Sequence, residues 1–310
     1  MSALPVLAQG SSDAGAAAPR PVAAAGVDPC WQATGRLALP VPELREVARM
    51  LRRQVVQLVR RHGQGYVQQG LGAAELFASL YFHEAAIDPA EPRWPRRDRC
   101  ILSTAHNSAL FHAALALRGM IPEADLAGYV VDGSALEINV SERLGPVVEG
   151  TFGSLGQGVS AAAGMALASR LSGVDWRVNV ILGDGELEEG QVWEAAMFAG
   201  SQKLGNLCVI LDLNWMQVEG HTDQVLRLAP IADKWRAFGW QAIEVDGHDL
   251  DALVAAFGLA RANRAQPTIL IATTVPGKGV RALEGVISHN AKLPADLADA
   301  ALAELEARHG

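Results

Sequence analysis

An aspartate between two glycines, with an asparagine after the next apolar run, constrains the fold of this chain most strongly. Apolar residues 178–182 precede a Gly-Asp-Gly turn centred on Asp184, and a helix-like run then leads to apolar residues 207–213 and Asn214. This order predicts a strand, a helix and a second strand, which together make one parallel crossover unit. Ligands of open parallel sheets bind at the carboxyl ends of the strands. Asp184 and Asn214 therefore predict two oxygen ligands there for Mg²⁺ or Ca²⁺.

The same alternation of apolar runs and helical patterns extends over the rest of the chain. Runs at 99–103, 240–245 and 268–273 predict three more strands, with helix-like segments between them. Strands that are apolar on both faces are typical of a parallel sheet covered on both sides. We therefore expect an α/β fold, a parallel sheet with helices on both faces, that forms one domain over residues 37–310.

The composition of the first residues differs from that of the remaining chain, and the overall composition excludes several classes of function. Residues 1–36 are rich in Ala, Gly, Ser and Pro and predict a disordered extension. A net charge of −8 without a basic cluster argues against nucleic acid. No apolar run approaches the ~20 residues that span a membrane, and no signal peptide is recognisable. The 3 cysteines lack disulfide or metal spacing. A reducing cytosol fits this spacing, so we expect a cytoplasmic protein.

Two further segments predict polar groups at the carboxyl edge. Residues 153–158 read Gly-Ser-Leu-Gly-Gln-Gly and open a predicted helix. Backbone N–H groups at a helix N-terminus bind phosphate, although this glycine pattern alone is a weak motif. His106 follows the predicted strand 99–103, and a lone histidine at such a place is more often structural than catalytic. Each of these two segments indicates a function only when it is considered together with the sequence around Asp184.

The text from residue 183 to residue 214 carries a specific resemblance. It reads GDGELEEGQVWEAAMFAGSQKLGNLCVILDLN, and it is similar to the thiamin diphosphate motif of transketolases. The resemblance covers about residues 43–292 and implies the thiamin diphosphate-binding fold of the transketolase N-terminal portion. It also implies thiamin diphosphate and Mg²⁺ as cofactors. The implied reaction is ketol transfer, in which a two-carbon unit moves from a ketose phosphate to an aldose phosphate.

The resemblance assigns roles to individual positions. The implied metal ligands are Asp184, Asn214 and the backbone carbonyl of Met216. His106 and His289 match family histidines near the cofactor diphosphate and the substrate, so both are expected to bind the cofactor and to be catalytic. Glu194, with Glu189, matches carboxylates that link paired active sites, or it is an ordinary surface residue. The implied cofactor-binding set is His106, Gly153, Leu155, Gly183, Asp184, Gly185, Glu189, Asn214 and His289.

Two places depart from the family pattern. Tyr66 stands where transketolases carry a histidine in a GHPGG-like text, and residues 132–146 contain no histidine where a GHPE-like text is expected. The sequence leaves open whether Glu137, Asn139 or Arg143 replaces that second histidine. The family text Asp-Gly-His-Asp also occurs, and we interpret its His248 as structural.

The resemblance stops before the pyrimidine-binding domain of the family, which carries the glutamate that activates the cofactor. We therefore expect the N-terminal subunit of a split transketolase, partnered by a C-terminal, pyrimidine-binding subunit. Homodimerisation would make a heterotetramer. One alternative is a subunit of another thiamin diphosphate enzyme, a 2-oxo acid dehydrogenase or decarboxylase, although the text after Asp184 favours transketolase. The other alternative, a non-catalytic binding scaffold, stays open because of Tyr66 and residues 132–146.

Overall fold

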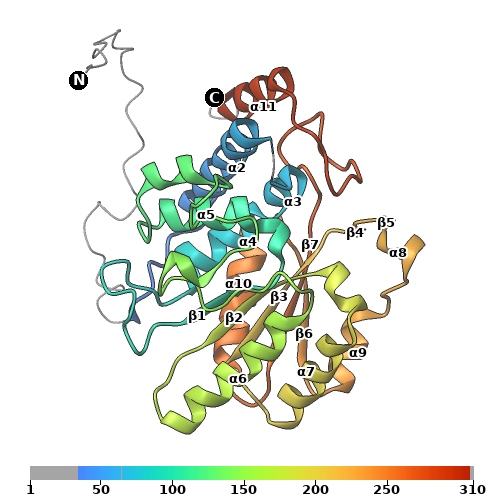
Figure 1. The fold of residues 1–310 in the computed structure, drawn as a ribbon. Helices are drawn as coiled ribbons and strands as arrows, with labels where there is room; N and C mark the ends of the chain where they lie inside the picture. Colours follow the sequence, from blue (N-terminus) through green and yellow to red (C-terminus); the bar gives the residue numbers. More distant parts are fainter. Residues whose placement is uncertain (1–33, 64, 308–310) are drawn as a thin grey trace, which may run out of the picture.

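A parallel sheet forms the centre of the molecule (Figure 1). The computed structural model describes residues 34–63 and 65–307. The sheet has five strands in the order β1-β2-β3-β7-β6, and every neighbouring pair is parallel. The strands are β1 (Arg99–Leu102), β2 (Val178–Gly183), β3 (Leu207–Leu213), β6 (Gln241–Asp246) and β7 (Thr268–Thr273). The predicted α/β fold with a parallel sheet is confirmed.

Helices cover both faces of this sheet because its central strands are apolar on both sides. Val209 and Leu211 of β3 belong to one core, whereas Cys208 and Ile210 belong to the other. The first core lies under α6 (Gln157–Ser172), α7 (Gly190–Ser201) and α9 (Ile231–Ala237). The second lies under α2 (Val41–His62), α3 (Val67–Gly72), α4 (Ala74–Ser79), the π-helix η2 (Leu80–Glu84), α5 (Ser108–Leu117) and α10 (Leu250–Ala262), and α11 (Ala295–Ala307) packs on α2.

Short elements connect these layers, mostly near the strand ends. They are η3 (Ala105–Asn107), η4 (Glu123–Gly128), η5 (Glu142–Leu144), η6 (Asp184–Glu188), β4 (Met216–Gln217), β5 (Gly220–His221) and α8 (Thr222–Val225). Of these, η3 follows β1, η6 follows β2, and β4 comes soon after β3. The turns that matter for function therefore lie at the carboxyl edge of the sheet.

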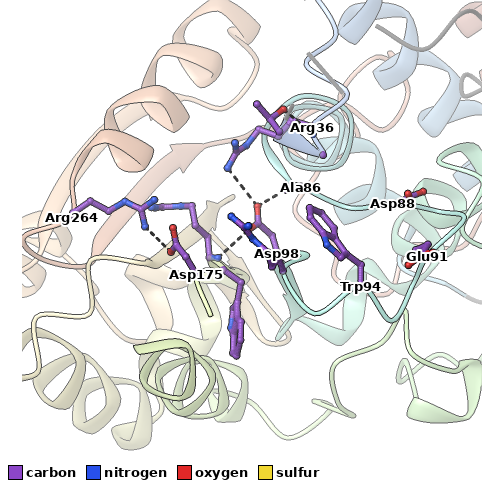
Figure 2. Close-up of a pocket in the computed structure, with 13 residues that line it drawn as sticks. Arg36, Ala86, Asp88, Glu91, Trp94, Asp98, Asp175 and Arg264 are labelled. Carbon is purple, nitrogen blue, oxygen red and sulfur yellow. Dashed lines mark hydrogen bonds and ion pairs between the residues drawn. The ribbon is translucent and has the colours of Figure 1, made fainter. Parts of the chain in front are cut away.

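A charged cavity of about 560 Å³ lies at the opposite, amino edge of the sheet (Figure 2). Asp98, just before β1, accepts hydrogen bonds there from the backbone N–H groups of Ala86 and Arg177, at 2.9 Å each. Arg36 lines the same cavity and donates to the Glu84 carbonyl at 2.7 Å. The predicted disordered extension, residues 1–36, otherwise lies outside the described residues. We call this space the amino-edge cavity.

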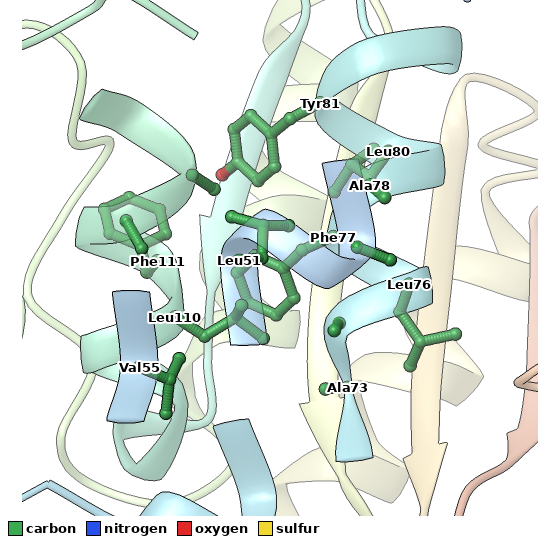
Figure 3. Packing of buried hydrophobic residues seen from close by; sticks show 14 of the residues in the cluster. Leu51, Val55, Ala73, Leu76, Phe77, Ala78, Leu80, Tyr81, Leu110 and Phe111 are labelled. Atoms are coloured by element: carbon green, nitrogen blue, oxygen red, sulfur yellow. The ribbon is translucent and has the colours of Figure 1, made fainter. Parts of the chain in front are cut away.

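The larger apolar core joins α2, α4 and α5 (Figure 3). Leu51 and Val55 of α2 meet Phe77 of α4 and Phe111 of α5, and all four side chains are at most 1% exposed. Burying one such side chain contributes about 1.5–3 kcal/mol. Within the described residues, no helix is both long enough and apolar enough to cross a membrane.

In the glycine-rich stretch 65–72, residues 67–72 form helix α3. Its glycines permit close packing instead of chain reversal, since a Cβ on Gly72 would lie 2.9 Å from the carbonyl oxygen of Val275. Gly63 does end a helix in the left-handed region, with a φ of 66°. The stretch therefore docks a helix tightly beside the loop that follows β7.

Candidate functional site

The carboxyl edge brings together the polar residues that follow β1, β2 and β3. In the parallel register Gly183 pairs with Asp212, so Asp184 and Asn214 follow the ends of adjacent strands. The carboxylate Oδ2 of Asp184 accepts a hydrogen bond from the backbone N–H of Trp215 at 2.6 Å. Asp184 is thereby tied to the turn that carries Asn214, as the strand–helix–strand pattern predicts.

That turn places Asn214 and Met216 beside the short helix η6, which begins with Asp184. Trp215 lies in the left-handed region with a φ of 61°, a strained conformation for a residue that is not glycine. The side-chain oxygen of Asn214 accepts the N–H of Met216 at 2.9 Å. Asp184 Oδ1 accepts the N–H of Gly185 at 2.9 Å. Each side-chain oxygen keeps a further lone pair, so both residues remain able to bind a cation.

Burial makes the charge on Asp184 costly. The residue is 1% exposed, and burial, followed by the nearby charge of Asp212, raises the pKa of its carboxyl group well above the usual range. Burial also raises the pKa of Asp212, which accepts hydrogen bonds from Thr274 and from the Asn214 amide. A divalent cation bound to Asp184 would offset both the desolvation and the repulsion. Sequence reasoning left Asp212 unassigned.

The donor set at this turn fits a hard cation. One carboxylate, one amide oxygen and the backbone carbonyl of Met216 are the oxygen ligands that Mg²⁺ takes when phosphate and water complete its shell. Zinc would require several nitrogen or sulfur ligands. In residues 34–63 and 65–307, no group of three or more His, Cys, Asp and Glu side chains could hold a metal. The residues present therefore fit a magnesium–diphosphate ligand.

Tyr66, His106 and His289 form a cluster of three rings, which we call the ring cluster. The centroid of Tyr66 lies 6.2 Å from that of His106 and 5.0 Å from that of His289, and the two imidazoles are 5.6 Å apart. Residues 66, 106 and 289 are far apart in sequence, and the fold brings them together. Two of them are the predicted catalytic histidines, and the third is the tyrosine that departs from the family.

Both histidines of the ring cluster are neutral at physiological pH. Burial, with a smaller contribution from His289, lowers the pKa of His106 to about 3. Burial also lowers the pKa of His289. His106 Nε2 and His289 Nδ1 are buried and have no hydrogen-bond partner among the described residues. A neutral imidazole has one donor and one acceptor nitrogen, so these rings suit an uncharged polar ligand group.

Two glutamines of α3 hold His289 in place. The side-chain amide of Gln69 donates to the His289 carbonyl at 3.0 Å, and that of Gln68 donates to the Val286 carbonyl at 2.6 Å. The backbone carbonyl of Gln68 accepts the N–H of Gly277 at 2.8 Å. The loop after β7 is thus fixed to the helix that begins next to Tyr66.

His248 occupies the structural place that the sequence suggested. Its Nδ1 lies 3.1 Å from the Glu75 carboxylate, and its Nε2 accepts the N–H of Val275 at 2.9 Å. Both ring nitrogens are therefore used within the fold. His248 supports the start of the loop that ends at His289.

Glu186 is a site residue that sequence reasoning missed. Its Oε1 accepts hydrogen bonds from the Ser103 hydroxyl at 2.6 Å and the Gly156 N–H at 2.8 Å, and its Oε2 accepts the Gly183 N–H at 2.8 Å. One carboxylate therefore joins the end of β1, the loop before α6 and the end of β2. The available signal is a glutamate three residues after Gly183, because a side chain at this position can reach back to the backbone N–H before the turn, as in one half of a capping box.

The loop before α6 lies close to the end of β1. A Cβ on Gly158 would come within 2.5 Å of the Ser103 side chain, so the helix N-terminus approaches the strand more closely than another residue would allow. Leu155 is 42% exposed, and its carbonyl accepts the Gln191 amide at 2.6 Å. Gly153 precedes it. The predicted phosphate-binding loop therefore borders the same edge as Asp184.

The structure separates the three candidates in the 132–146 stretch. Arg143 forms an ion pair with Glu137, and both side chains are more than a third exposed. A Cβ on Gly153 would lie 2.9 Å from Cγ of Asn139, so the Asn139 carboxamide covers the loop before α6. Asn139 is therefore the candidate that contacts the predicted cofactor loop.

The two predicted linking carboxylates differ in their surroundings. Glu189 precedes α7 as its N-cap residue and is half-buried, whereas Glu194 is exposed on that helix. Met197 and Phe198 of α7 are 55% and 43% exposed. The amino-edge cavity contains none of the predicted site residues. A six-residue strand spans about 20 Å, so this cavity lies roughly that far from Asp184.

Comparisons with known proteins converge on one family. The profile described as "Transketolase, thiamine diphosphate binding domain" matches residues 44–309. The 6-deoxy-6-sulfo-D-fructose transketolase subunit of Clostridium sp. (strain MSTE9) is 41% identical over 265 residues, which are 85% of this chain and 96% of that protein. One of the apulose-4-phosphate transketolase subunits of Actinobacillus succinogenes (strain 130Z) is 36% identical over 270 residues, which are 86% of this chain and 98% of that protein.

Solved structures agree with the sequence comparisons. The crystal structure of transketolase from Campylobacter jejuni superimposes with a TM-score of 0.76 at 26% identity. The match covers 87% of this chain and 48% of that one, so this chain spans about half the length of that transketolase. The sheet and the helices on both its faces are thus those of a known fold.

Proposed function

This chain belongs to the transketolase family and carries its thiamin diphosphate-binding domain, and we propose that it is the N-terminal subunit of a two-subunit transketolase. Together with a C-terminal, pyrimidine-binding subunit it transfers a ketol unit from a ketose phosphate to an aldose phosphate. Support comes from two relatives that are named as transketolase subunits, because the match spans 96% and 98% of their lengths. The proposal includes a cytoplasmic heterotetramer built by homodimerisation.

The cofactor position in this proposal follows from the residues at the carboxyl edge. Thiamin diphosphate supplies the carbanion chemistry of ketol transfer when it is bound. Asp184, Asn214 and the Met216 carbonyl would hold Mg²⁺, and the backbone N–H groups of the loop before α6 would bind the diphosphate. Glu189 and the glycines that flank Asp184 lie in the same region. Glu186 positions these loops through its hydrogen bonds to Ser103, Gly156 and Gly183.

One observation carries the proposal. Asp184 is buried, has a raised pKa and accepts hydrogen bonds from the backbone N–H groups of Gly185 and Trp215. A buried carboxylate without a cationic partner costs stability. A buried carboxylate beside Asn214 and Met216 is expected of a cation ligand. A scaffold that binds no cofactor would have no need for such a carboxylate.

The ring cluster would face the substrate side of this site. His106 and His289 are neutral, so they donate and accept single hydrogen bonds and carry no charge toward a phosphate. We propose that the donor is a ketose other than the common pentose and hexose phosphates. The observations behind this are Tyr66 in the cluster and the absence of histidine from residues 132–146.

The test is partner-dependent ketol transfer. This chain alone, with thiamin diphosphate and Mg²⁺, is expected to transfer no ketol unit, and activity should appear when the pyrimidine-binding subunit is added. Pyruvate decarboxylation in the same mixture tests the 2-oxo acid alternative, and we expect none. Rapid turnover by the chain alone would refute the two-subunit hypothesis. An inert complex that fails to bind the cofactor would support the scaffold alternative.

A further inference from the structure

We propose that Tyr66 is the residue that determines donor specificity, with its phenol hydroxyl bonding a hydroxyl of the donor ketose against the rings of His106 and His289. This inference rests on the proposed function and deepens it. It assigns a role to the residue that departs from the family pattern. Three properties of Tyr66 carry it: its difference from the other tyrosines, the rings around it and the contacts that fix its position.

Tyr66 differs from the other two of the chain's 3 tyrosines. Tyr81 and Tyr129 are core residues, 2% and 0% exposed, and the Tyr129 hydroxyl bonds to Ser108 at 3.0 Å. Tyr66 is only half-buried. Its hydroxyl makes no hydrogen bond within residues 34–63 and 65–307, and its ring contacts those of the two histidines. A phenol placed in this way retains a donor and an acceptor for a ligand.

The polar groups of the ring cluster are uncharged. His106 Nε2 and His289 Nδ1 are buried without a partner in the described part of the chain, and burial lowers the pKa of both imidazoles. Buried polar groups of this kind cost free energy until a ligand satisfies them. Neutral imidazole and phenol groups each offer one donor and one acceptor, which matches the hydroxyl groups of a sugar.

The position of Tyr66 is fixed from both sides. Gly65 precedes it in the left-handed region, with a φ of 109°, and packs so closely on Tyr129 that a Cβ would lie 2.9 Å from its hydroxyl. Helix α3 follows Tyr66, and its Gln69 holds His289. A site whose side chains are fixed in position discriminates between ligands, because these side chains cannot move to accommodate a ligand of another shape. Tyr66 and His289 therefore act as one preformed wall.

Size and hydrogen bonding together give the specificity. A phenol is larger than the imidazole that the family carries at this place, and it presents its polar atom at the far end of the ring. A site built to bond a hydroxyl discriminates strongly against ligands that leave its polar groups unpaired. The expected donor is a ketose with an anionic terminus, phosphate or sulfonate, and with a hydroxyl that meets the Tyr66 oxygen.

The experiment uses the reconstituted complex with thiamin diphosphate and Mg²⁺. The kcat and KM values are measured for xylulose 5-phosphate, fructose 6-phosphate and 6-deoxy-6-sulfo-D-fructose in the wild type and in Tyr66→Phe, Tyr66→His and Tyr129→Phe. Tyr66→Phe should lower kcat/KM for the best donor about tenfold, as expected for one lost hydrogen bond. Tyr66→His should change the kcat/KM ratio between donors by about tenfold or more. Calorimetry should show cofactor affinity unchanged within about twofold.

Tyr129→Phe is the matched control, since it removes the same hydroxyl from a core position. It should lower Tm through the loss of the Ser108 bond and leave donor ratios unchanged. Donor ratios that stay within about twofold in both Tyr66 variants would overturn the inference while the proposed function stands. Weaker cofactor binding in Tyr66→Phe would also overturn it, because Tyr66 would then belong to the cofactor site. A wild-type complex without ketol transfer would remove the proposed function and this inference together.

Discussion

Asp184, at the end of β2, is a buried carboxylate that accepts its hydrogen bonds from the backbone. It is buried, and its hydrogen bonds come from the backbone N–H groups of Gly185 and Trp215. Backbone donors favour the charged carboxylate, whereas burial and Asp212 disfavour it, and the raised pKa shows that the unfavourable contributions are larger. Without a cation, this residue reduces stability at neutral pH. Its value to the chain is therefore functional.

At this scale we predict that Asp184→Ala and Asn214→Ala each abolish Mg²⁺-dependent retention of thiamin diphosphate. Each substitution removes one ligand of an octahedral ion, so cofactor affinity should fall by more than about 100-fold. Tm without cofactor should not fall in Asp184→Ala, because a costly buried charge is removed. Calorimetry with cofactor and Mg²⁺ checks the affinity. Asp246→Ala is the control, at the exposed end of β6, and unchanged affinity in an Asp184 or Asn214 variant would contradict the ligand assignment.

The sequence predicts single residues well where a local pattern places them. Asp184 and Asn214 follow two apolar runs, and parallel pairing then brings them to the same edge without further information. Glu186 and Asp212 could not be assigned in this way. Glu186 bonds to Ser103, which is 83 residues away, and Asp212 bonds to Thr274, 62 residues away. The local spacing of Glu186 indicates only its bond to Gly183, three residues away, and the other bonds depend on tertiary contacts.

Among the elements, the short turn η6 connects three separate segments at the carboxyl edge of the sheet. Glu186 within it joins β1, β2 and the loop before α6. Two of these three donors are backbone N–H groups at the predicted diphosphate site. The turn therefore sets the distance between the metal-binding and the phosphate-binding segments.

We predict that Glu186→Gln destabilises the chain by about 2 kcal/mol and lowers Tm by about 4–8 °C. The amide keeps the shape, but its NH₂ group must face either the Gly183 N–H or the Ser103 and Gly156 donors, so at least one buried donor loses its partner. Thiamin diphosphate affinity should fall with the loss of loop position. Thermal denaturation and calorimetry measure the two effects. Glu188→Gln, in the same turn and without a side-chain hydrogen bond in the described residues, should change Tm little; an equal loss there would contradict this role of Glu186.

Element types were largely predictable, and the exceptions have physical reasons. The five strands lie within a few residues of their predicted bounds, because their apolar runs are strong. The stretch 67–72 forms a helix although glycines usually indicate flexibility in a sequence, because these glycines allow close packing against Val275. The terminal helix begins at Ala295, and its start is marked by Pro294 directly before it and by Asp296 in its first turn. Its apolar face packs on α2.

At the scale of the whole molecule, the two edges of the sheet have different tasks. The carboxyl edge carries the proposed cation ligands, the ring cluster and the loop before α6. The amino edge carries the charged cavity around Asp98, whose carboxylate accepts two backbone hydrogen bonds within the fold (Figure 2). A partner subunit that completes the cofactor site must cover the first edge and can leave the second exposed.

We predict that hydrogen exchange distinguishes these edges. When the pyrimidine-binding subunit, thiamin diphosphate and Mg²⁺ are added, amides in segments 104–107, 153–158 and 214–217 should exchange at least about tenfold more slowly, because binding suppresses local opening. Segments 88–98 and 175–177 at the amino edge serve as the internal control and should keep their rates. Protection confined to the amino edge would show that the partner binds elsewhere.

The hydrogen bond from Gln69 to the His289 carbonyl also affects the order in which parts of the site form during translation. These two residues are 220 positions apart, and this contact closes the ring cluster. A nascent chain presents Tyr66, His106, Asp184 and Asn214 well before His289 leaves the ribosome, and contacts of such long range form late in folding. An incomplete translation product can therefore carry every proposed cation ligand and still lack the His289 side of the ring cluster.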